Sequence, residues 1–293
     1  MYKFLPLIIT TLSPFIWAFM NSLDKYVISH KVKKPFGFAI VAGLVNLIFG
    51  VVFSLFLQWK NISLGSLIFP VLAGIMFGCQ LVIYYLIIQK EDISKVIGII
   101  YLYPLLVALL SFLFLSEVIS LTGYIGMFVT LAGVIMLSTR MPKLRTKLGI
   151  FLLISLVFMV AFYEFFVKIA TEKIPSFNGL AISIIVAGFT VLLCLFAKKG
   201  RIEFFEEFKN IKYSFLIESF TFLGIATTYF GMSYLPATVF SSISAMQPLG
   251  VLIFETAFER RFGKMVKDKF SKKLFPICLI ILGVILLYIN QLR

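Results

Sequence analysis

Residues 65–88 read GSLIFPVLAGIMFGCQLVIYYLII, a stretch without a single charged side chain. A helix of about 20 apolar residues crosses the hydrocarbon core of a bilayer, so this stretch predicts a membrane-spanning helix. Similar apolar runs lie on both sides of it along the chain. The ten predicted spans lie at about residues 5–21, 36–58, 65–88, 94–115, 120–138, 148–169, 178–197, 213–233, 236–256 and 274–290.

The composition of the whole chain agrees with a membrane protein. Of the 293 residues, 61% are hydrophobic and 14% are charged, and the mean hydropathy is +1.05. A soluble domain has a more even mixture. The runs lack the alternating pattern of barrel strands, and a lipid-exposed backbone satisfies its own hydrogen bonds in helices. We therefore expect an all-α integral membrane protein with ten transmembrane helices.

The net charge of +14 comes from lysines and arginines near the ends of the spans. These residues are not interleaved with exposed aromatics in a polar domain, so we do not expect nucleic-acid binding. With ten spans, 22 of the 27 basic residues lie on the side of the loop between the first two spans. Because basic loops face the cytoplasm, the sequence predicts a multi-pass protein of the cytoplasmic membrane with both termini outside.

One loop has a pattern of its own. Residues 198–212 read KKGRIEFFEEFKNIK, which places Ile202, Phe205, Phe208 and Ile211 near helical spacing among charged residues. This pattern favours a short helix lying on the membrane surface. A solvated loop is the alternative.

Several classes of chemistry are not expected. Each of Cys79, Cys194 and Cys278 lies alone in an apolar run, and His30 is the single histidine. These residues offer neither a disulfide framework nor a common metal site, and no cofactor is indicated. The chain has no phosphate-binding loop of the Gly-x4-Gly-Lys type. The first apolar run lacks a clear cleavage site, so it is not expected to be a removable signal.

The two halves of the chain resemble each other. The offset that carries Pro104 onto Pro248 also aligns Tyr85 with Tyr229 and Ser94 with Thr238. The sequence GVIML at 133–137 resembles GVILL at 283–287. Two tandem copies of a five-helix unit must cross the membrane in opposite senses, which gives an inverted repeat. We expect one repeat at 1–139, a basic linker at 140–147 and a second repeat at 148–293.

Glycines indicate where helices approach closely. Gly74 and Gly78 form a small-xxx-small spacing, and Gly123, Gly126 and Gly133 recur along the fifth span. Such spacings allow neighbouring backbones to pack together.

The first half also carries a family pattern. Pro104 is followed by Glu117 after a Leu/Phe-rich stretch, then by Gly123, Gly126 and the sequence LAGV at 131–134. This order resembles the proline, glycine-glutamate and glycine pattern of EamA-type members of the drug/metabolite transporter superfamily. Trp17-Ala18 is similar to their Trp-Gly pair.

The chain departs from that pattern at three points. Arg261 stands where the second half of the family has an acid, with Glu259 nearby, and Asn46 stands where an arginine is often found. Family members usually keep both termini in the cytoplasm, whereas the loop charges here predict the reverse.

The resemblance implies a central cavity between the repeats, lined by the first four helices of each, with the fifth and tenth helices at the periphery. Trp17, Asn21, Tyr163 and Glu164 would face this cavity. Rocking of the repeats around it would give alternating access.

Polar residues near matching places in the two halves are further candidates for the cavity. Each can bind a solute or join two helices by a hydrogen bond. They are Gln80, Tyr84, Tyr101, Tyr229 and Gln247. Pro104 and Pro248 are expected to interrupt the hydrogen-bond ladder in mid-helix and to permit gating bends.

Carboxylates inside the spans are costly and therefore invite a functional explanation. Glu164 is a candidate, although Lys168 one turn later could neutralise it. Glu218 has no cation three or four residues away, while Glu255 lies close to Glu259 and Arg260 and is most simply an interfacial acid. Glu117, at a helix end beside Ser116, is expected to be a structural cap or a hairpin anchor. If transport is coupled to a proton, Glu164 and Glu218 are the preferred carriers.

The leading functional hypothesis is a secondary transporter, an exporter or an exchanger, of a small organic metabolite such as an amino acid or a drug-like amphiphile. A proton, another ion, exchange or the substrate gradient would drive transport. The alternative is a flippase for a lipid-linked or phosphorylated head-group carrier, which the basic residues at 264–273 could attract. We expect no enzymatic activity, because the polar groups do not converge on one catalytic cluster. A structural scaffold would not require the paired prolines or the intramembrane acids.

Overall fold

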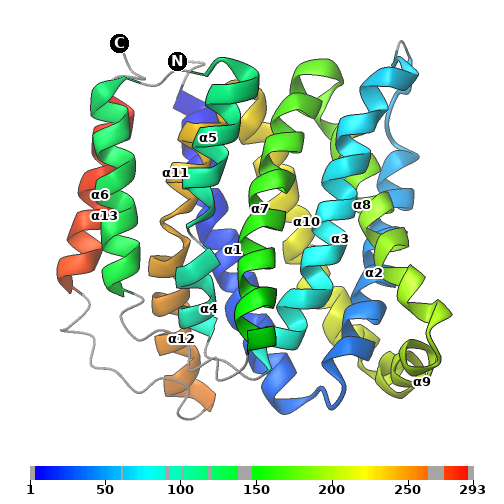
Figure 1. Ribbon diagram of the computed structural model, residues 1–293. Helices are drawn as coiled ribbons and strands as arrows, with labels where there is room; N and C mark the ends of the chain where they lie inside the picture. Colours follow the sequence, from blue (N-terminus) through cyan, green and yellow to red (C-terminus); the bar gives the residue numbers. More distant parts are fainter. Residues whose placement is uncertain are drawn as a thin grey trace.

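A computed structural model describes residues 4–60, 62–89, 93–100, 102–117, 120–137, 147–262 and 274–289, and all the regular structure in them is helical. Figure 1 shows the helices standing side by side in one bundle. The first half contains α1 (Phe4–His30), α2 (Pro35–Ser54), η1 (Leu64–Leu67), α3 (Ile68–Ile88), α4 (Ile93–Ile100), α5 (Tyr103–Leu115) and α6 (Leu121–Leu137). The second half contains α7 (Lys147–Lys173), α8 (Ser176–Leu192), η2 (Leu193–Phe196), α9 (Lys198–Glu207), η3 (Phe208–Asn210), α10 (Ile211–Tyr234), α11 (Ala237–Ser244), α12 (Gln247–Phe262) and α13 (Leu274–Ile289).

Both halves have the same order of principal helices. The short helix α4 begins at Ile93 and its counterpart α11 begins at Ala237, so their starts are separated by the same offset as the two paired prolines. This offset also relates Tyr103 at the start of α5 to Gln247 at the start of α12. The sequence repeat is therefore also a repeat of structure.

The predicted kinks at the two paired prolines are corrected by the structure. The fourth and ninth spans are not single helices with a proline in the middle. Each is divided into two helices, α4 with α5 and α11 with α12, and Pro104 and Pro248 lie in the first turns of α5 and α12. A proline suits that position because the first turn needs no donor from its nitrogen. Both prolines thus begin a helix after a break.

The first helices of the repeats run in opposite directions. The loop after α1 lies beside α9, because the backbone N–H groups of Lys33 and Lys34 each donate to Glu207 at 2.9 Å. This is the side on which α8 ends. In contrast, α7 leads directly into the start of α8, so α1 and α7 end on opposite sides of the bundle (Figure 1). An inverted repeat requires this arrangement.

The number of spans is supported only in part. In the described residues, six helical stretches are long and apolar enough to cross a membrane, and Tyr103–Leu115 and Leu121–Met136 are shorter apolar helices. A multi-pass architecture follows, while the count of ten stays a prediction. The first predicted span was also too short, because α1 continues from Asn21 to His30.

Glycines bring α3 against α8, as their spacing predicts. A Cβ atom at Gly74 would lie 2.6 Å from the carbonyl oxygen of Ser183, and one at Gly78 would lie 2.8 Å from that of Ala187. Gly133 of α6 meets the carbonyl oxygen of Pro276 in the same way. Neighbouring backbones can approach this closely only where the side chain is absent.

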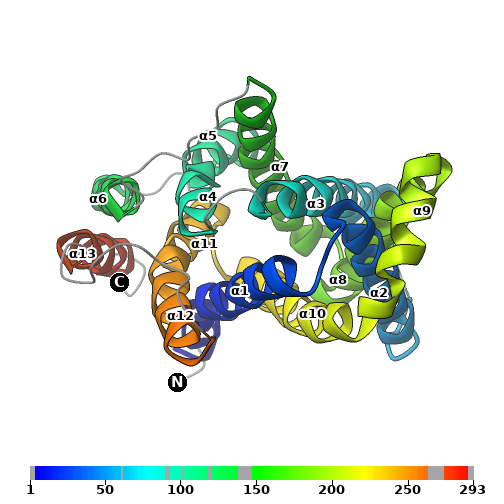
Figure 2. The same cartoon turned by 90° about the horizontal axis from the view of Figure 1, so that it is seen from below.

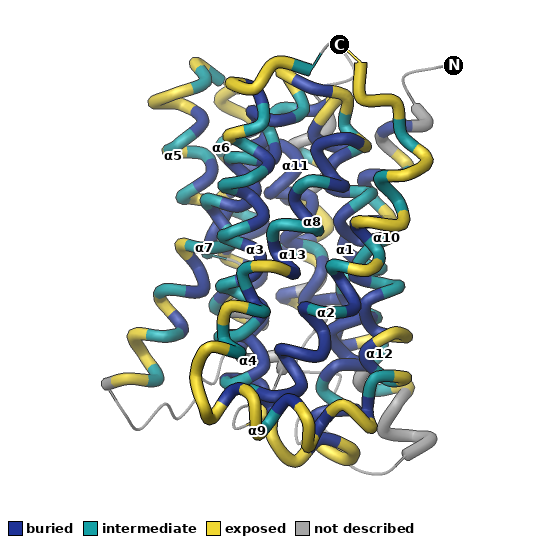
Figure 3. Tube along the Cα trace, turned by 90° about the vertical axis from the view of Figure 1, so that its right-hand side faces the viewer, coloured by how far each residue is buried: buried dark blue, intermediate teal, exposed yellow. Residues whose placement is uncertain are grey.

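The outer surface of the bundle is apolar. Phe112, Phe114, Phe128 and Phe151 are all more than half exposed. Figure 3 shows buried residues on the inward sides of the helices and exposed ones on the outside. The α6–α13 pair stands at the edge of the bundle in Figure 2, which agrees with the peripheral place expected for the fifth and tenth spans.

The helix expected within 198–212 is present as α9, followed by the short turn η3. Phe204 is buried, while Ile202 and Phe205 are exposed by 50% and 74%. Figure 2 places α9 at the edge of the bundle. The exposed apolar side chains suit a membrane surface, and its position in the interface stays a prediction.

Candidate functional site

A cavity of about 110 Å³ lies between the two repeats. Helices α1, α3, α4 and α5 line it from the first repeat, and their counterparts α7, α10, α11 and α12 line it from the second. This corrects one expectation, because no described residue of α2 or α8 lines the cavity. These two helices pack against each other, and the glycines of α3 face α8 rather than the cavity.

Seven of the nine residues predicted for the cavity line it. They are Trp17, Asn21, Gln80, Tyr84, Tyr163, Glu164 and Gln247. Tyr101 lies outside the described residues. Tyr229 is fully buried but is not among the lining residues, and its hydroxyl forms a hydrogen bond with that of Ser183. For Tyr229, the helix–helix alternative is therefore the one that the structure supports.

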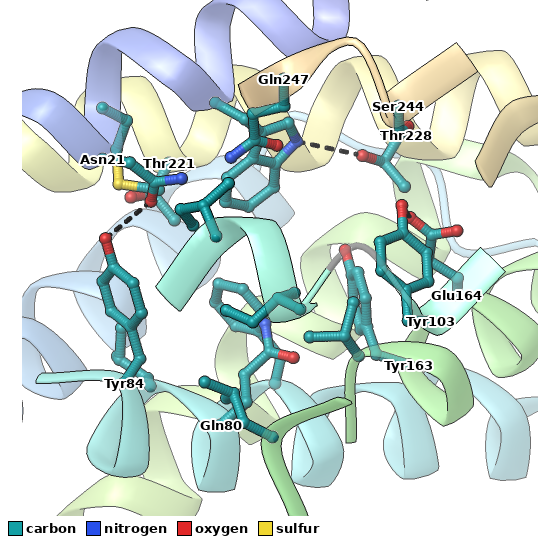
Figure 4. Close-up of a pocket in the computed structure, with 18 of the residues that line it drawn as sticks. Asn21, Gln80, Tyr84, Tyr103, Tyr163, Glu164, Thr221, Thr228, Ser244 and Gln247 are labelled. Atoms are coloured by element: carbon teal, nitrogen blue, oxygen red, sulfur yellow. Dashed lines mark hydrogen bonds between the residues drawn. The ribbon is translucent and has the colours of Figure 1, made fainter. Parts of the chain in front are cut away.

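Hydrogen bonds within the cavity join different helices (Figure 4). The hydroxyl of Tyr84 in α3 donates to Oδ1 of Asn21 in α1 at 2.8 Å. The indole N–H of Trp17 donates to the hydroxyl of Thr228 in α10 at 3.4 Å. The repeat offset that relates the paired prolines also carries Tyr84 onto Thr228, so equivalent positions of α3 and α10 both contact α1.

Glu164 is a cavity residue with one free acceptor atom. The hydroxyl of Tyr103 donates to its Oε1 at 2.7 Å, while its Oε2 is buried without a hydrogen-bond partner. The alternative pairing with Lys168 is wrong. Nζ of Lys168 lies 3.2 Å from Glu172 and donates to the carbonyl oxygens of Met232 and Leu235, also at 3.2 Å. Lys168 therefore joins α7 to the end of α10 and does not pair with the Glu164 carboxylate.

A second carboxylate of the cavity was missed by the sequence analysis. Asp24 is 1% exposed and accepts a hydrogen bond from the Tyr85 hydroxyl at 2.9 Å. The same hydroxyl lies 3.4 Å from Oε1 of Glu218, and Nδ2 of Asn46 donates to Oε2 of Glu218 at 2.8 Å. Asp24 escaped notice because the first span was ended at Asn21. Its place one helical turn after Asn21, on the same helix face, is the signal that could have revealed it.

Glu218 does not line the cavity itself. It is fully buried between α10, α2 and α3, and Tyr85 connects it to Asp24 at the cavity wall. Glu255 lies in α12, but its side chain is outside the described part of the chain, as are the basic residues at 264–273. In the described residues no group of three or more His, Cys, Asp or Glu side chains could hold a metal ion.

Comparison with protein families gives a match over almost the whole chain. The model of the EamA-like transporter family matches residues 5–139 and again residues 147–289. The chain belongs to the EamA-like transporter family. The family is one of multi-pass membrane transporters rather than of enzymes, and membership implies a bilayer environment and a small-molecule substrate.

Solved structures add support for the fold alone. This EamA-like bundle is similar to a protein known from its crystal structure, with a TM-score of 0.67 and 15% sequence identity. The alignment covers 97% of this chain and 99% of the other. A comparison with curated proteins finds no match.

Two positions of the EamA pattern have structural explanations here. Glu117 follows α5, and its carboxylate accepts from the backbone N–H groups of Ala237 and Thr238 at 3.0 and 3.3 Å. It thus caps α11, as its expected structural role requires. Asn46, which replaces an arginine common in the family, supports Glu218. No buried cation neutralises Glu218 through that position.

Proposed function

We propose that this EamA-like protein is a secondary transporter that moves a small organic metabolite through the central cavity by alternating access. The observation that carries the proposal is the cavity itself, which equivalent helices of both repeats line. A site at the interface of inverted repeats becomes accessible from either side when one repeat tilts against the other. The broken spans α4–α5 and α11–α12 reach the cavity from opposite halves and are suited to bend.

We also propose that a proton can take part in the cycle. Glu164 is only 6% exposed at the cavity, and Glu218 is fully buried behind Tyr85. A buried carboxylate without a partner cation can be neutralised by a proton. Glu164 is the more direct carrier, because the substrate itself can reach it.

The flippase alternative receives less support. The described residues that line the cavity include no lysine, arginine or histidine to bind a phosphorylated head group. The cavity volume of about 110 Å³ is also below the ~300–1,000 Å³ typical of sites for drug-sized ligands. The first observation disfavours a phosphorylated head group, and the second favours a small solute.

We place the protein in the cytoplasmic membrane with the α9 side of the bundle facing the cytoplasm. Lys31, Lys33, Lys34 and the lysines of α9 gather there, whereas Lys60 and Lys173 lie on the opposite side. This placement rests on the positive-inside rule.

The proposal is tested in two steps. A thermal-shift screen of the purified protein against small metabolites and lipid head groups identifies ligands of the native state, because binding raises apparent stability. A stabilising compound is then followed in proteoliposomes. We expect uptake above that of protein-free vesicles, accelerated by the same compound on the opposite side. Binding without such flux would contradict the proposal.

A further inference from the structure

The charges that line the cavity have one sign. Asp24 and Glu164 contribute carboxylates, and among the described lining residues there is no basic side chain. The two acids are 1% and 6% exposed. An anionic solute would oppose the ionised form of these two carboxylates in a low-dielectric site, whereas a cation would favour that form and be attracted by it.

Residues of the cavity wall also carry buried polar atoms that lack partners. In the described part of the chain, Oε1 of Gln80, the hydroxyl of Tyr163 and Oε2 of Glu164 are buried without a hydrogen bond, and all three residues line the cavity. Two of these atoms are acceptors by nature, and a tyrosine hydroxyl can also accept. A buried acceptor without a donor is unfavourable. An occupant that satisfied them would therefore carry N–H or O–H donors.

Aromatic rings form one wall of the site. The rings of Trp17 and Phe77 are 6.3 Å apart between centroids, and those of Phe77 and Tyr163 are 5.4 Å apart. Glu164 is the next residue after Tyr163. Aromatic faces attract cations and also pack against apolar bodies. The wall thus offers an apolar surface that ends beside a carboxylate.

We propose that the cavity binds a small organic cation, a protonated amine on an apolar body about the size of one ring, with its ammonium group donating to Oε2 of Glu164. An ammonium group supplies several donors and a positive charge at once. The volume of about 110 Å³ is near that of an engineered cavity of ~150 Å³ that accepts benzene. This inference rests on the proposed transport function and specifies the class of its substrate.

The chain contains a natural fluorescent reporter with which binding in the cavity can be tested. It has two tryptophans, of which Trp17 lines the cavity and Trp59 lies outside it, 43% exposed. The variant Trp59→Phe therefore leaves a single tryptophan at the site. Its fluorescence is titrated with three compounds of matched shape: benzylamine, which is a cation at neutral pH, benzyl alcohol, which is neutral, and benzoate, which is an anion.

We expect benzylamine to change the Trp17 emission saturably, benzyl alcohol to act more weakly, and benzoate to have no saturable effect. Replacing Glu164→Gln in the same background should weaken benzylamine binding about tenfold or more, because a charged hydrogen bond is lost. The matched control is Glu172→Gln, an exposed acid of the same helix that does not line the cavity. This control should leave the affinity unchanged.

Preference for benzoate over benzylamine, or the absence of a benzylamine response, would overturn the inference. So would a Glu164→Gln variant that binds benzylamine as well as the parent. If that variant does not fold, the comparison of the three compounds in the unaltered cavity still decides the charge preference. Saturable benzylamine binding without transport would contradict the proposed function and leave this inference standing. Transport with a preference for anions would contradict this inference and leave the proposed function standing.

Discussion

Glu164 and Glu218 occupy different places relative to the cavity although the sequence presents both simply as intramembrane acids. Oε1 of Glu164 accepts a hydrogen bond from Tyr103, and its Oε2 has no hydrogen-bond partner. Glu218 is engaged by Asn46 and Tyr85 and does not line the cavity. Their contributions to transport should therefore be separable.

If a proton is coupled, Glu164→Gln should abolish the pH dependence of uptake, because the amide cannot exchange a proton in this range. Glu218→Gln should reduce the rate and leave a pH dependence, since Glu164 is intact. Both are measured as initial uptake rates in proteoliposomes over a series of pH values. Undiminished and still pH-dependent uptake in both variants would exclude these carboxylates as proton carriers.

Ser116 carries the one positive φ angle found at a non-glycine residue of the described chain, φ 53° and ψ 26° at the end of α5. A left-handed conformation costs an L-residue roughly 1–2 kcal/mol, which glycine avoids at some cost in entropy. Ser116→Gly should therefore raise the free energy of unfolding by about 0.5–1 kcal/mol. Ser116→Ala keeps the Cβ atom and is the control. A higher melting temperature for Ala than for Gly would refute this explanation.

Seven of the nine residues that the sequence predicted for the cavity do line it, because intramembrane polar residues are rare enough to stand out. The sequence could not identify Asp24, whose place inside the protein depends on how far α1 continues beyond Asn21. Nor could the sequence show which side chain forms a hydrogen bond or an ion pair with Glu164. Lys168 is correctly spaced along the helix, yet the neighbouring end of α10 offers it carbonyl oxygens.

At the scale of elements, the two broken spans matter most. Residues 94–115 and 236–256 look continuous in the sequence because their breaks contain no charged residue. A proline marks either a kink or a helix start, and only the packed structure shows which. Because α11 begins inside the protein, its free N–H groups need an acceptor, and Glu117 from the other repeat supplies it.

Loss of this cap should destabilise the protein. Glu117→Ala removes the acceptor for Ala237 and Thr238, and we expect a loss of about 1–2 kcal/mol, as for other helix caps. The melting temperature of the purified protein reports it. Glu206→Ala, at an exposed acid of α9, should have little effect. Equal melting temperatures for the two variants would contradict the capping role.

The contact between α3 and α8 depends on the absence of a side chain at Gly74. A Cβ atom there would be 2.6 Å from a carbonyl oxygen, so Gly74→Ala should push the helices apart and cost about 1–3 kcal/mol. Gly65→Ala is a suitable control, because nothing lies within 4 Å of the added atom. A Gly74→Ala protein as stable as the Gly65→Ala protein would show that this contact is not tight.

In the whole molecule, the repeats place equivalent contacts on opposite sides of the cavity. Nζ of Lys25 near the end of α1 donates to the carbonyl oxygen of Ile88 at the end of α3, at 2.6 Å. Lys168 near the end of α7 makes the corresponding contact with Met232 of α10. Ile88 and Met232 are themselves related by the repeat offset. Each side of the bundle is thus held by the same kind of contact, which suits two alternative openings.

The sequence indicated this architecture through its repeat and its odd number of spans per half. It did not indicate that the second helices of the repeats pack together outside the cavity, because their apolar faces look the same toward lipid and toward protein. Gly43 and Gly188, which meet Val191 and the backbone of Gly43 respectively, are the residues that allow this contact.

The most direct test of the account is the accessibility of the cavity from both sides of the membrane. A protein without Cys79, Cys194 and Cys278 is given one cysteine at the cavity residue Ser244. Control cysteines replace Ser63 and Lys34, which are exposed on opposite sides, and Phe128 on the lipid-facing surface. A membrane-impermeant thiol reagent is then added to either side of oriented vesicles.

We predict that the cysteine of Ser244→Cys reacts from both sides. The cysteine of Ser63→Cys should react only from outside and that of Lys34→Cys only from the cytoplasmic side, while that of Phe128→Cys should not react. Reaction of the Ser244→Cys protein from one side alone, both with and without benzylamine, would contradict alternating access through this cavity.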